Sequence, residues 1–212
     1  MIGIVDYGMG NLYSLSQALK RLEAAYFISS DSAELKEADG LILPGVGAFA
    51  DAMAALQKHR LVDFLRDMAS TKPLLGICLG MQLLFDESEE GRLTEGLGLL
   101  PGRIIRFSGS DGAGGRVKVP HMGWNTLDFR QPDSSLLRGV SPGYAYFVHS
   151  YYAQTTDQTI LIATAHYGDV DVPAIVGRGG VFGTQFHPEK SSDFGAALLK
   201  NYLNIVAGEV QK

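Results

Sequence analysis

The chain has 212 residues, of which 46% are hydrophobic and 19% charged, and its formal net charge at pH 7 is −5. This composition is typical of a compact globular protein and excludes a disordered chain, and the length favours one domain over residues 1–212. Because no basic patch stands out, we expect no nucleic-acid partner.

The cysteine content and the first residues indicate the cellular compartment and the absence of a metal site. The single cysteine, Cys78, cannot form an internal disulfide, and no Cys/His spacing suggests a zinc site. The opening residues, MIGIVDYGMGN, lack the basic start and the small-residue cleavage site of a signal peptide. No apolar run reaches the roughly 18 residues that a membrane-spanning helix needs. We therefore expect a cytoplasmic protein with no metal and no membrane association.

In the first half of the chain, strand and helix patterns alternate. Short apolar runs predict strands at 2–6, 25–29, 40–44 and 72–78. Apolar residues at helical spacing predict helices at 12–24, at 49–70 with a break near Arg60, and at 79–90. Strands that alternate with helices indicate right-handed crossovers and a mostly parallel sheet, which is an α/β fold.

The second half consists of short β-branched or aromatic segments separated by Gly, Pro and Asp. Such segments predict antiparallel strands, here at 102–107, 115–120, 123–129, 144–154, 159–167, 173–178 and 181–188. A final helix is expected at 194–208, and the glycine-rich stretch 108–115 is interpreted as a surface loop. The expected fold is a single α/β domain with a mostly parallel central sheet, flanking helices and additional antiparallel strands.

Cys78 lies between Gly76 and Gly80 in GICLG, which is the spacing of the G-x-S-x-G nucleophile elbow. A nucleophile at a tight strand-to-helix turn has a strained backbone, so the flanking positions need little or no Cβ bulk. The following helix would direct its positive end at the sulfur and favour thiolate, and the Leu79 N–H would face a developing oxyanion. The alternative is a buried free cysteine that only fills the core, and the spacing alone leaves both open.

A thiolate nucleophile needs a base, and His187 is the best candidate among the five histidines. In GTQFHPEKS a strand ends at His187 and Glu189 follows two residues later, on the same side of an extended segment. Glu189 can therefore hold the far ring nitrogen of His187, as the third member of a catalytic triad does. Either residue alone could be an ordinary strand-end side chain, but together with Cys78 they favour catalysis. His59 and His166 lie in polar or turn-like stretches and are interpreted as structural or solvated.

Two loops rich in glycine follow other predicted strands. The loop PGVGAF (44–49) would lie at the carboxyl edge of the parallel sheet, where ligands bind in open α/β folds. Its glycines, Gly45 and Gly47, allow the backbone to approach a substrate, although an ordinary strand exit is the alternative. The loop DYGMGN (6–11) lacks the third glycine of a dinucleotide-binding loop, so we interpret it as a tight turn with Asn11 as a helix N-cap.

Together these residues resemble a known family, the class I or triad glutamine amidotransferases. Cys78 in GICLGMQ and His187 and Glu189 in FHPEKS carry the resemblance. The stretches DYGMGNLYSL, LPGVGAF, PHMGWN and YFVHSYY are similar, more narrowly, to the glutaminases that serve a separate (β/α)8-barrel cyclase in histidine biosynthesis. The resemblance covers essentially the whole chain except 108–115.

The resemblance implies a flavodoxin-like glutamine amidotransferase fold, hydrolysis of L-glutamine without a cofactor, and a heterodimer with the cyclase, which would use the released ammonia. Cys78 would be the nucleophile, His187 the base and acid, and Glu189 the orienting carboxylate. The implied oxyanion region is Gly45, Val46 and Leu79. The implied substrate contacts are Gly47, Gln82, Ser150 and Tyr151. The candidate residues of the partner interface are Asn11, Ser14, Met122, Trp124, Tyr146 and Lys190.

Alternatives stay open at this point. The chain could be the glutaminase subunit of another ammonia-channelling synthase, such as one that makes pyridoxal phosphate, and only PHMGWN and DYGMGNLYSL argue against it. It could also be a non-catalytic binding or regulatory module of the same fold, which the intact triad disfavours. Trp124 and Tyr146 could pack in the core, and Lys190 could be an unpaired surface lysine.

Overall fold

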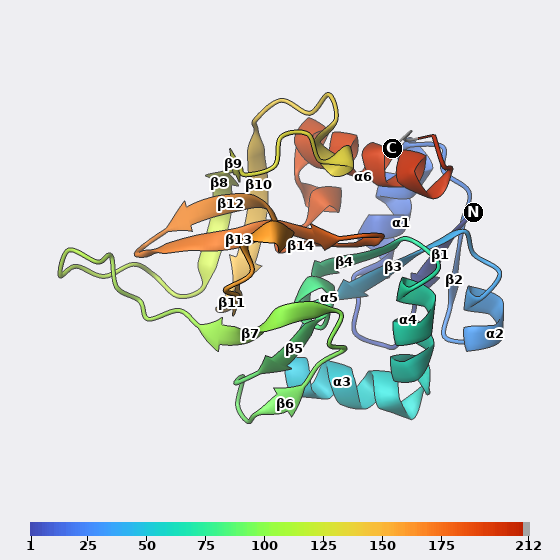
Figure 1. Cartoon of the computed structure of the whole chain (residues 1–212), viewed down its shortest axis with the longest axis horizontal. Coiled ribbons are helices and arrows are strands. Elements are labelled where there is room, and N and C mark those ends of the chain that lie inside the picture. The colour runs from blue at the N-terminus through green and yellow to red at the C-terminus, as the bar shows by residue number, and fades with distance from the viewer. Residues whose placement is uncertain (210–212) are drawn as a thin grey trace.

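An eight-stranded sheet runs through the middle of the molecule in the computed structural model, which describes residues 1–209 (Figure 1). Residues 210–212, part of the expected domain, lie outside the described residues. In spatial order the strands are β2 (Tyr26–Ser29), β1 (Ile2–Val5), β3 (Gly40–Gly45), β4 (Leu74–Cys78), β14 (Val181–Thr184), β13 (Val170–Arg178), β12 (Leu161–Tyr167) and β9 (Asp128–Phe129).

The order of the parallel strands defines the fold. Strands β2, β1, β3, β4 and β14 run parallel to their neighbours, while β13, β12 and β9 continue the sheet in antiparallel pairs. This is the 2-1-3-4-5 order of flavodoxin-like folds, which bind ligands at the carboxyl ends of the strands. The predicted α/β fold is confirmed, and β14 is an exception to the antiparallel pairing expected of the second half.

Helices cover both faces of this sheet, α1 and α6 on one and α3 and α4 on the other (Figure 1). The helices are α1 (Leu12–Arg21), α2 (Ser32–Leu35), α3 (Phe49–Lys58), α4 (Leu61–Ala69), α5 (Leu79–Gln82) and α6 (Ser192–Val206). Within β3, Leu41 and Leu43 join the core under α3 and α4, whereas Ile42 joins the core under α1 and α6. Burial on both faces explains why these strands are continuous apolar runs.

Two smaller sheets lie beside the central one. The first pairs β8 (His121–Thr126) with β10 (Tyr144–His149), and the second consists of β11 (Tyr151–Gln154), β7 (Leu100–Arg106), β5 (Phe85–Ser88) and β6 (Thr94–Glu95). Short 3₁₀ helices are η1 (Ser135–Leu137), η2 (Gln158–Ile160) and η3 (Pro188–Lys190). The predicted strands 144–154 and 123–129 are therefore wrong as single units, because the chain changes sheets at Ser150 and at Leu127.

The helix predicted at 79–90 is also wrong, since α5 is one turn long and ends at Gln82. The carbonyls of Leu83 and Leu84, which a longer helix would have used, instead accept hydrogen bonds from N–H groups of Leu97 and Leu99, both at 2.8 Å. The chain then continues as β5, parallel to β7. These tertiary hydrogen bonds override the apolar pattern that favoured a helix.

The strand predicted at 115–120 is wrong too, because this segment belongs to an exposed loop with a single bridge between Ser110 and Arg116. The Asp111 carboxylate accepts hydrogen bonds from the N–H groups of Ala113 and Gly115, which stabilises the turn locally. The break near Arg60 is confirmed, since Arg60 has φ +58° between α3 and α4. Helix α2 was not predicted.

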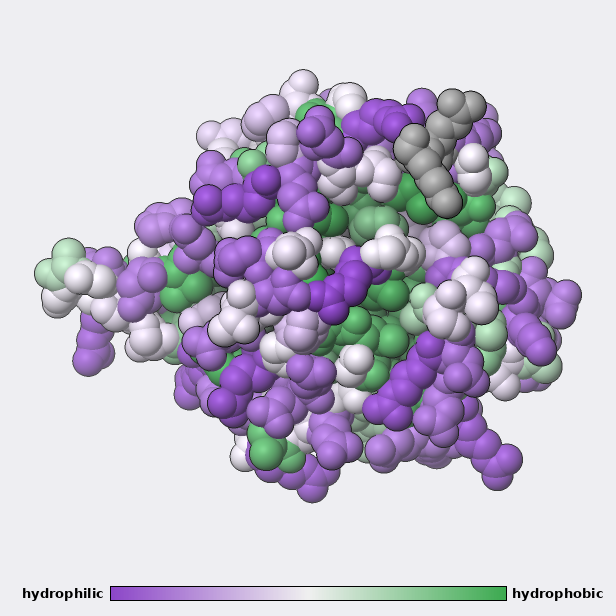
Figure 2. Space-filling view, viewed as in Figure 1, coloured by the Kyte–Doolittle hydropathy of each residue, from purple (hydrophilic) through white to green (hydrophobic). Residues whose placement is uncertain are grey.

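The hydropathy of the surface agrees with a fold whose central strands are buried beneath helices. In the view of Figure 2, hydrophilic side chains cover most of the face, and apolar side chains gather toward its middle, over β3 and β4. Among the described residues, no helix combines the length and the apolar character needed to cross a membrane.

One close contact fixes the turn between β4 and α5. A Cβ atom on Gly80 would lie 1.8 Å from the carbonyl oxygen of Leu43 in β3, and one on Gly76 would lie 2.5 Å from the carbonyl oxygen of Gly80. Both clashes are with main chain, which cannot move aside like a flexible side chain. The glycines around Cys78 are therefore required by packing.

We expect Gly80→Ala to destabilise the protein by about 3 kcal/mol, because the new methyl group must push α5 away from β3. A thermal unfolding scan measures the loss as a lower Tm. The matched control is Gly180→Ala, where the nearest atoms would be 3.7 Å away, in ordinary contact. Equal Tm values for the two variants would contradict the packing argument.

Candidate active site

The carboxyl ends of β3, β4 and β14 meet at one edge of the sheet. Gly45 pairs in register with Cys78, and Thr184 pairs with Ile77, one residue before it. His187 follows β14 by three residues, so the parallel pairing of β14 with β4 brings it to the same edge as Cys78. Residues far apart in sequence thereby converge on one site.

Cys78 forms the strained turn that its flanking glycines suggest. Its backbone has φ +55° and ψ −111°, which a residue with a side chain rarely adopts and which costs of order 1–3 kcal/mol. The residue is 7% exposed, at the last position of β4. The helix that follows Cys78 is shorter than the sequence predicts. Because α5 has a single turn, its dipole at Cys78 is weaker than that of a long helix.

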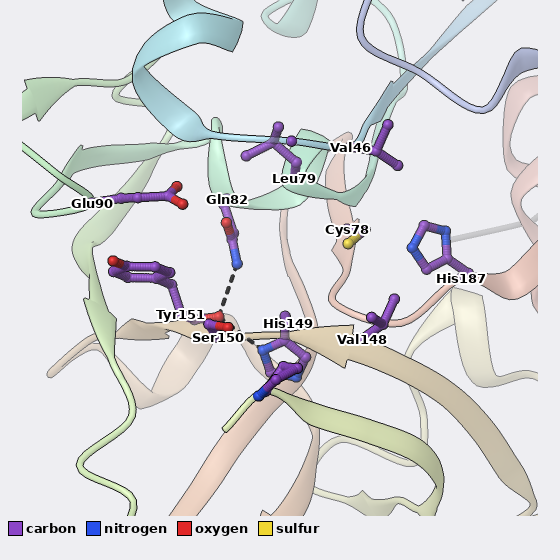
Figure 3. A pocket seen from close by; sticks show the side chains of 12 residues that line it. Val46, Cys78, Leu79, Gln82, Glu90, Val148, His149, Ser150, Tyr151 and His187 are labelled. Carbon is purple, nitrogen blue, oxygen red and sulfur yellow. Dashed lines mark hydrogen bonds between the residues drawn. The ribbon is translucent and has the colours of Figure 1, made fainter. Parts of the chain in front are cut away.

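His187 and Glu189 form a buried pair. The Nδ1–H of His187 donates to Oε1 of Glu189 at 2.8 Å, and the side chains are 4% and 3% exposed. The short helix η3 begins at Pro188, which turns the chain so that the carboxylate lies against the ring. The sulfur of Cys78 lies on the side of the ring that faces the cavity (Figure 3).

Opposing effects set the pKa of His187. Burial lowers it, but hydrogen bonds to Cys78 and Glu189 and their negative charges outweigh burial and raise the pKa to about 10. The ring is therefore protonated at neutral pH, between the sulfur of Cys78 and the carboxylate of Glu189. In this state the proton that a leaving group needs is already on His187.

A cavity of about 370 Å³ opens in front of this pair. It brings together eight of the residues singled out from the sequence: Val46, Gly47, Cys78, Leu79, Gln82, Ser150, Tyr151 and His187. Gly45 and Glu189 lie behind its wall, in a separate small space of about 10 Å³. A cavity of this size fits a small molecule such as an amino acid.

Gln82 is held rigidly at the side of the cavity. Its Nε2 donates to the carbonyl of Tyr151 at 2.9 Å (Figure 3). The same Nε2 also donates to Oε1 of Gln185 at 3.0 Å. The sequence did not single out Gln185, although it lies two residues before His187 on the same extended segment. Its burial just after the end of β14 could not be read from the pattern.

Val46 does not present its N–H to the cavity in this conformation. That N–H donates to the carbonyl of Met9 at 2.8 Å, while the side chain is 42% exposed. Leu79, another of the expected oxyanion residues, directly follows Cys78 and begins α5. The loop 44–49 must therefore rearrange before Val46 can serve as a donor.

Four further lining residues were missed from the sequence, namely Glu90, Pro120, Val148 and His149. Glu90 accepts a hydrogen bond from the N–H of Phe49 at 2.8 Å and lies across the cavity from His187 (Figure 3). It had been placed at the end of the wrongly predicted helix. His149 lies on β10 at the cavity wall, opposite His121 on β8. No local pattern marks Glu90 or His149, because Glu90 lies in the turn after β5 and His149 ends β10, and only folding brings them to the cavity.

Of the candidate interface residues, Met122 and Trp124 lie on β8 and Tyr146 lies on β10. Met122 is 61% and Trp124 56% exposed, so the alternative of core packing is excluded for Trp124. The ring of half-buried Tyr146 meets Trp124 edge to face, with centroids 5.8 Å apart. Lys190 is exposed.

The loop before α1 behaves as the sequence suggests. The side-chain oxygen of Asn11 accepts a hydrogen bond from the N–H of Ser14 at 3.2 Å. The expected N-cap is therefore confirmed, and both side chains remain partly exposed.

These features match a recognised class. The family model described as "Glutamine amidotransferase class-I" matches residues 3–205. The chain belongs to this family.

Relatives with high sequence identity are named as one subunit of a particular enzyme. The imidazole glycerol phosphate synthase subunit HisH of Geobacillus sp. (strain WCH70) is 59% identical over 210 residues, which cover 99% of each chain. The subunit HisH of Bacillus subtilis (strain 168) is 54% identical over 213 residues and covers all of both chains.

Solved structures show the same fold at low identity. A crystal structure of a glutamine amidotransferase has a TM-score of 0.74 at 21% identity and covers 98% of each chain. PurLQS from Thermotoga maritima also has a TM-score of 0.74, at 20% identity, over 97% of this chain and 98% of that one.

We expect His187 to keep its ring proton at pH 7 and to lose it near pH 10, because Cys78 and Glu189 favour the charged ring. Since the folded pKa lies above the ordinary 6.5, the associated stabilisation is fully present below pH 6.5 and is lost as the pH rises toward 10. Nitrogen-15 NMR of the ring follows the titration.

The variant Glu189→Gln removes one of these charges and should lower the titration midpoint of His187. A wild-type midpoint near 6.5 would contradict the ion-pair interpretation.

Proposed function

We propose that this chain is the glutaminase subunit of an imidazole glycerol phosphate synthase. It hydrolyses L-glutamine to L-glutamate and ammonia, and the ammonia passes to a (β/α)8-barrel cyclase subunit that forms imidazole glycerol phosphate in histidine biosynthesis. The observation that carries the proposal is that Cys78 and His187 line one cavity, with Glu189 hydrogen-bonded to His187 behind its wall, in a chain so similar to HisH subunits over its full length.

The reaction follows from the charges of the triad. The Cys78 thiolate attacks the side-chain carbonyl carbon of glutamine, and as the C–N bond breaks, His187 gives its proton to the departing ammonia. A water molecule, deprotonated by His187, then attacks the glutamyl thioester, and glutamate leaves as the C–S bond breaks. Glu189 holds the ring through Nδ1 and stabilises its charged form in both steps.

The cavity also suits the amino-acid end of glutamine. The carboxylate of Glu90 lies across the cavity from His187 and carries the charge that attracts an α-ammonium group. Gln82, Ser150 and Tyr151 line the space between these ends. Gly47 supplies backbone that can approach the substrate closely, since its φ of +107° suits glycine.

The oxyanion site requires a change of conformation. The Leu79 N–H is placed next to the nucleophile, whereas the Val46 N–H is held by the Met9 carbonyl. When that peptide turns, the Val46 N–H joins Leu79 beside Gly45 and stabilises the tetrahedral intermediate. We therefore expect a low basal activity that rises when the partner is loaded.

The partner docks over the mouth of the cavity. Met122, Trp124 and Tyr146 form an exposed apolar and aromatic surface of the kind enriched at interfaces. Asn11, Ser14 and Lys190 surround the same edge of the sheet with polar groups. Docking there excludes water, so that ammonia crosses without being protonated.

The remaining assignments follow from this role. The chain acts as one glutamine amidotransferase domain over 1–212, in the cytoplasm, in a heterodimer and without a cofactor. The identity with HisH subunits favours the cyclase of histidine biosynthesis over pyridoxal phosphate synthesis as the partner. The buried charged triad favours catalysis over a purely regulatory module.

The test of this function is glutamate release from glutamine by the chain alone, with the cyclase, and with the cyclase plus its ribonucleotide substrate. We expect release mainly in the third condition, at least tenfold above the first. The Cys78→Ala variant should be inactive in all three, because the attacking sulfur is gone, yet should bind the cyclase as tightly as wild type. Equal release in all three conditions would reject the partner assignment.

Trp124→Ala should weaken binding to the cyclase by about tenfold or more, since buried aromatic anchors dominate interfaces. Calorimetric titration with the cyclase measures the change, and free ammonia in the medium reports leakage. The control is Leu93→Ala, which removes another exposed apolar side chain, in the turn before β6. A large drop in Tm with normal affinity would instead indicate a structural role for Trp124.

A further inference from the structure

Two buried histidines outside the triad face each other across the β8–β10 pair. His121 and His149 are opposite in the strand register and are 3% and 7% exposed. Nδ1 of His121 lies 3.0 Å from Nε2 of His149, and Nδ1 of His149 lies 2.8 Å from the carbonyl oxygen of Tyr151. The mechanism above uses neither ring.

The partners of these nitrogens define where each proton is. A carbonyl oxygen can only accept, so Nδ1 of His149 carries a hydrogen. In a neutral ring Nε2 of His149 then accepts, and the hydrogen of that bond belongs to Nδ1 of His121. The remaining nitrogen of His121, Nε2, accepts from the amide of Asn125 at 3.3 Å. All the hydrogen bonds therefore run in one direction, from Asn125 to Tyr151.

Both rings are held neutral and in place. Burial lowers the pKa of His121 to about 4, and burial, against the hydrogen bond to Tyr151, lowers the pKa of His149 to about 3. The ring of His121 is stacked between Phe147 and Tyr167, with centroids 4.6 and 4.0 Å away. Rings locked in this way cannot rotate to exchange their donors and acceptors.

The end of this series of bonds lies in the glutamine cavity. The Tyr151 carbonyl accepts from His149 and also from Nε2 of Gln82, the side chain at the cavity wall. It lies at the first residue of β11, where the chain passes from one small sheet to the other at Ser150. The side chains of His149 and Gln82 therefore hold the Tyr151 carbonyl in place through these two hydrogen bonds.

We propose that His121 and His149 are positioning residues for the glutamine site, which fix the Tyr151 carbonyl and through it the amide of Gln82. This inference rests on the proposed function, because it assigns the pair to the binding of that substrate. The two rings act through Tyr151 and touch no reacting atom. Their removal therefore weakens substrate binding more than it slows the chemical step.

The first test reads the tautomers directly. Nitrogen-15 NMR of the wild-type chain between pH 6 and 8 should show both rings neutral, with hydrogens on Nδ1 and none on Nε2. A charged ring, or a hydrogen on Nε2 of either histidine, would overturn the inference. This measurement needs no activity and no variant.

The second test separates KM from kcat in the complex with the loaded cyclase. His149→Phe keeps a flat ring but removes both nitrogens, and it should raise the KM for glutamine about tenfold, with a smaller change in kcat. His149→Asn restores a donor near the Nδ1 position and should recover part of the loss. His59→Phe, at an exposed helix end, is the control and should leave both constants unchanged.

The outcomes separate this inference from the function on which it rests. Absence of glutamine turnover in the loaded wild-type complex would reject the proposed function. Normal turnover, with His149→Phe lowering Tm but leaving KM unchanged, would reject the positioning role alone. If His149→Phe does not fold, His149→Asn and the wild-type tautomers decide.

Discussion

The contact between Gly80 and the main chain of β3 is the constraint on which the catalytic geometry depends. Because no side chain separates them, α5 lies against the Leu43 carbonyl and the chain must turn sharply at Cys78. The strain at Cys78 is thus maintained by close packing of main chain on main chain. The turn also places Cys78 beside Gly45 and carries Leu79 into the cavity wall.

His187 and His149 both line the cavity, but the pKa of His187 is raised and that of His149 is lowered. The groups that each ring contacts explain this difference. His187 contacts the Glu189 carboxylate and the Cys78 side chain, which favour its charged form despite burial. His149 contacts a carbonyl and a second neutral ring, so burial determines its state. Tyr7 follows the same logic as His149, since burial raises its pKa and its hydroxyl donates to the Pro44 carbonyl. A single charged base is therefore surrounded by groups that do not compete for its proton.

What could be predicted from the sequence was local. The parallel strands, the break at Arg60, the Asn11 cap and the relation of His187 to Glu189 all depend on residues a few positions apart. The helix expected at 79–90 failed because its carbonyls are used by a segment more than ten residues later.

The remaining features of the site depend on how distant strands pair. Glu90 and His149 reach the cavity, and Gln185 reaches Gln82, through tertiary arrangements that no short motif specifies. The direction of the Val46 peptide depends on a hydrogen bond to Met9 in another loop. Physical reasoning from one sequence finds residues that act as neighbours along the chain and misses those that become neighbours by folding.

The two faces of the β8–β10 strand pair differ in burial, and this difference limits which insertions and deletions the pair can accept. Exposed Met122 and Trp124 alternate along β8 with buried His121 and half-buried Asn125, so neighbouring side chains point to opposite faces. Insertion or deletion of a single codon within either strand would turn every following side chain to the opposite face. It would expose a histidine that needs burial and bury a tryptophan that faces water. A change of length in this strand pair would therefore disturb both of its faces at once, whereas the loop at 108–115 contains no buried residue.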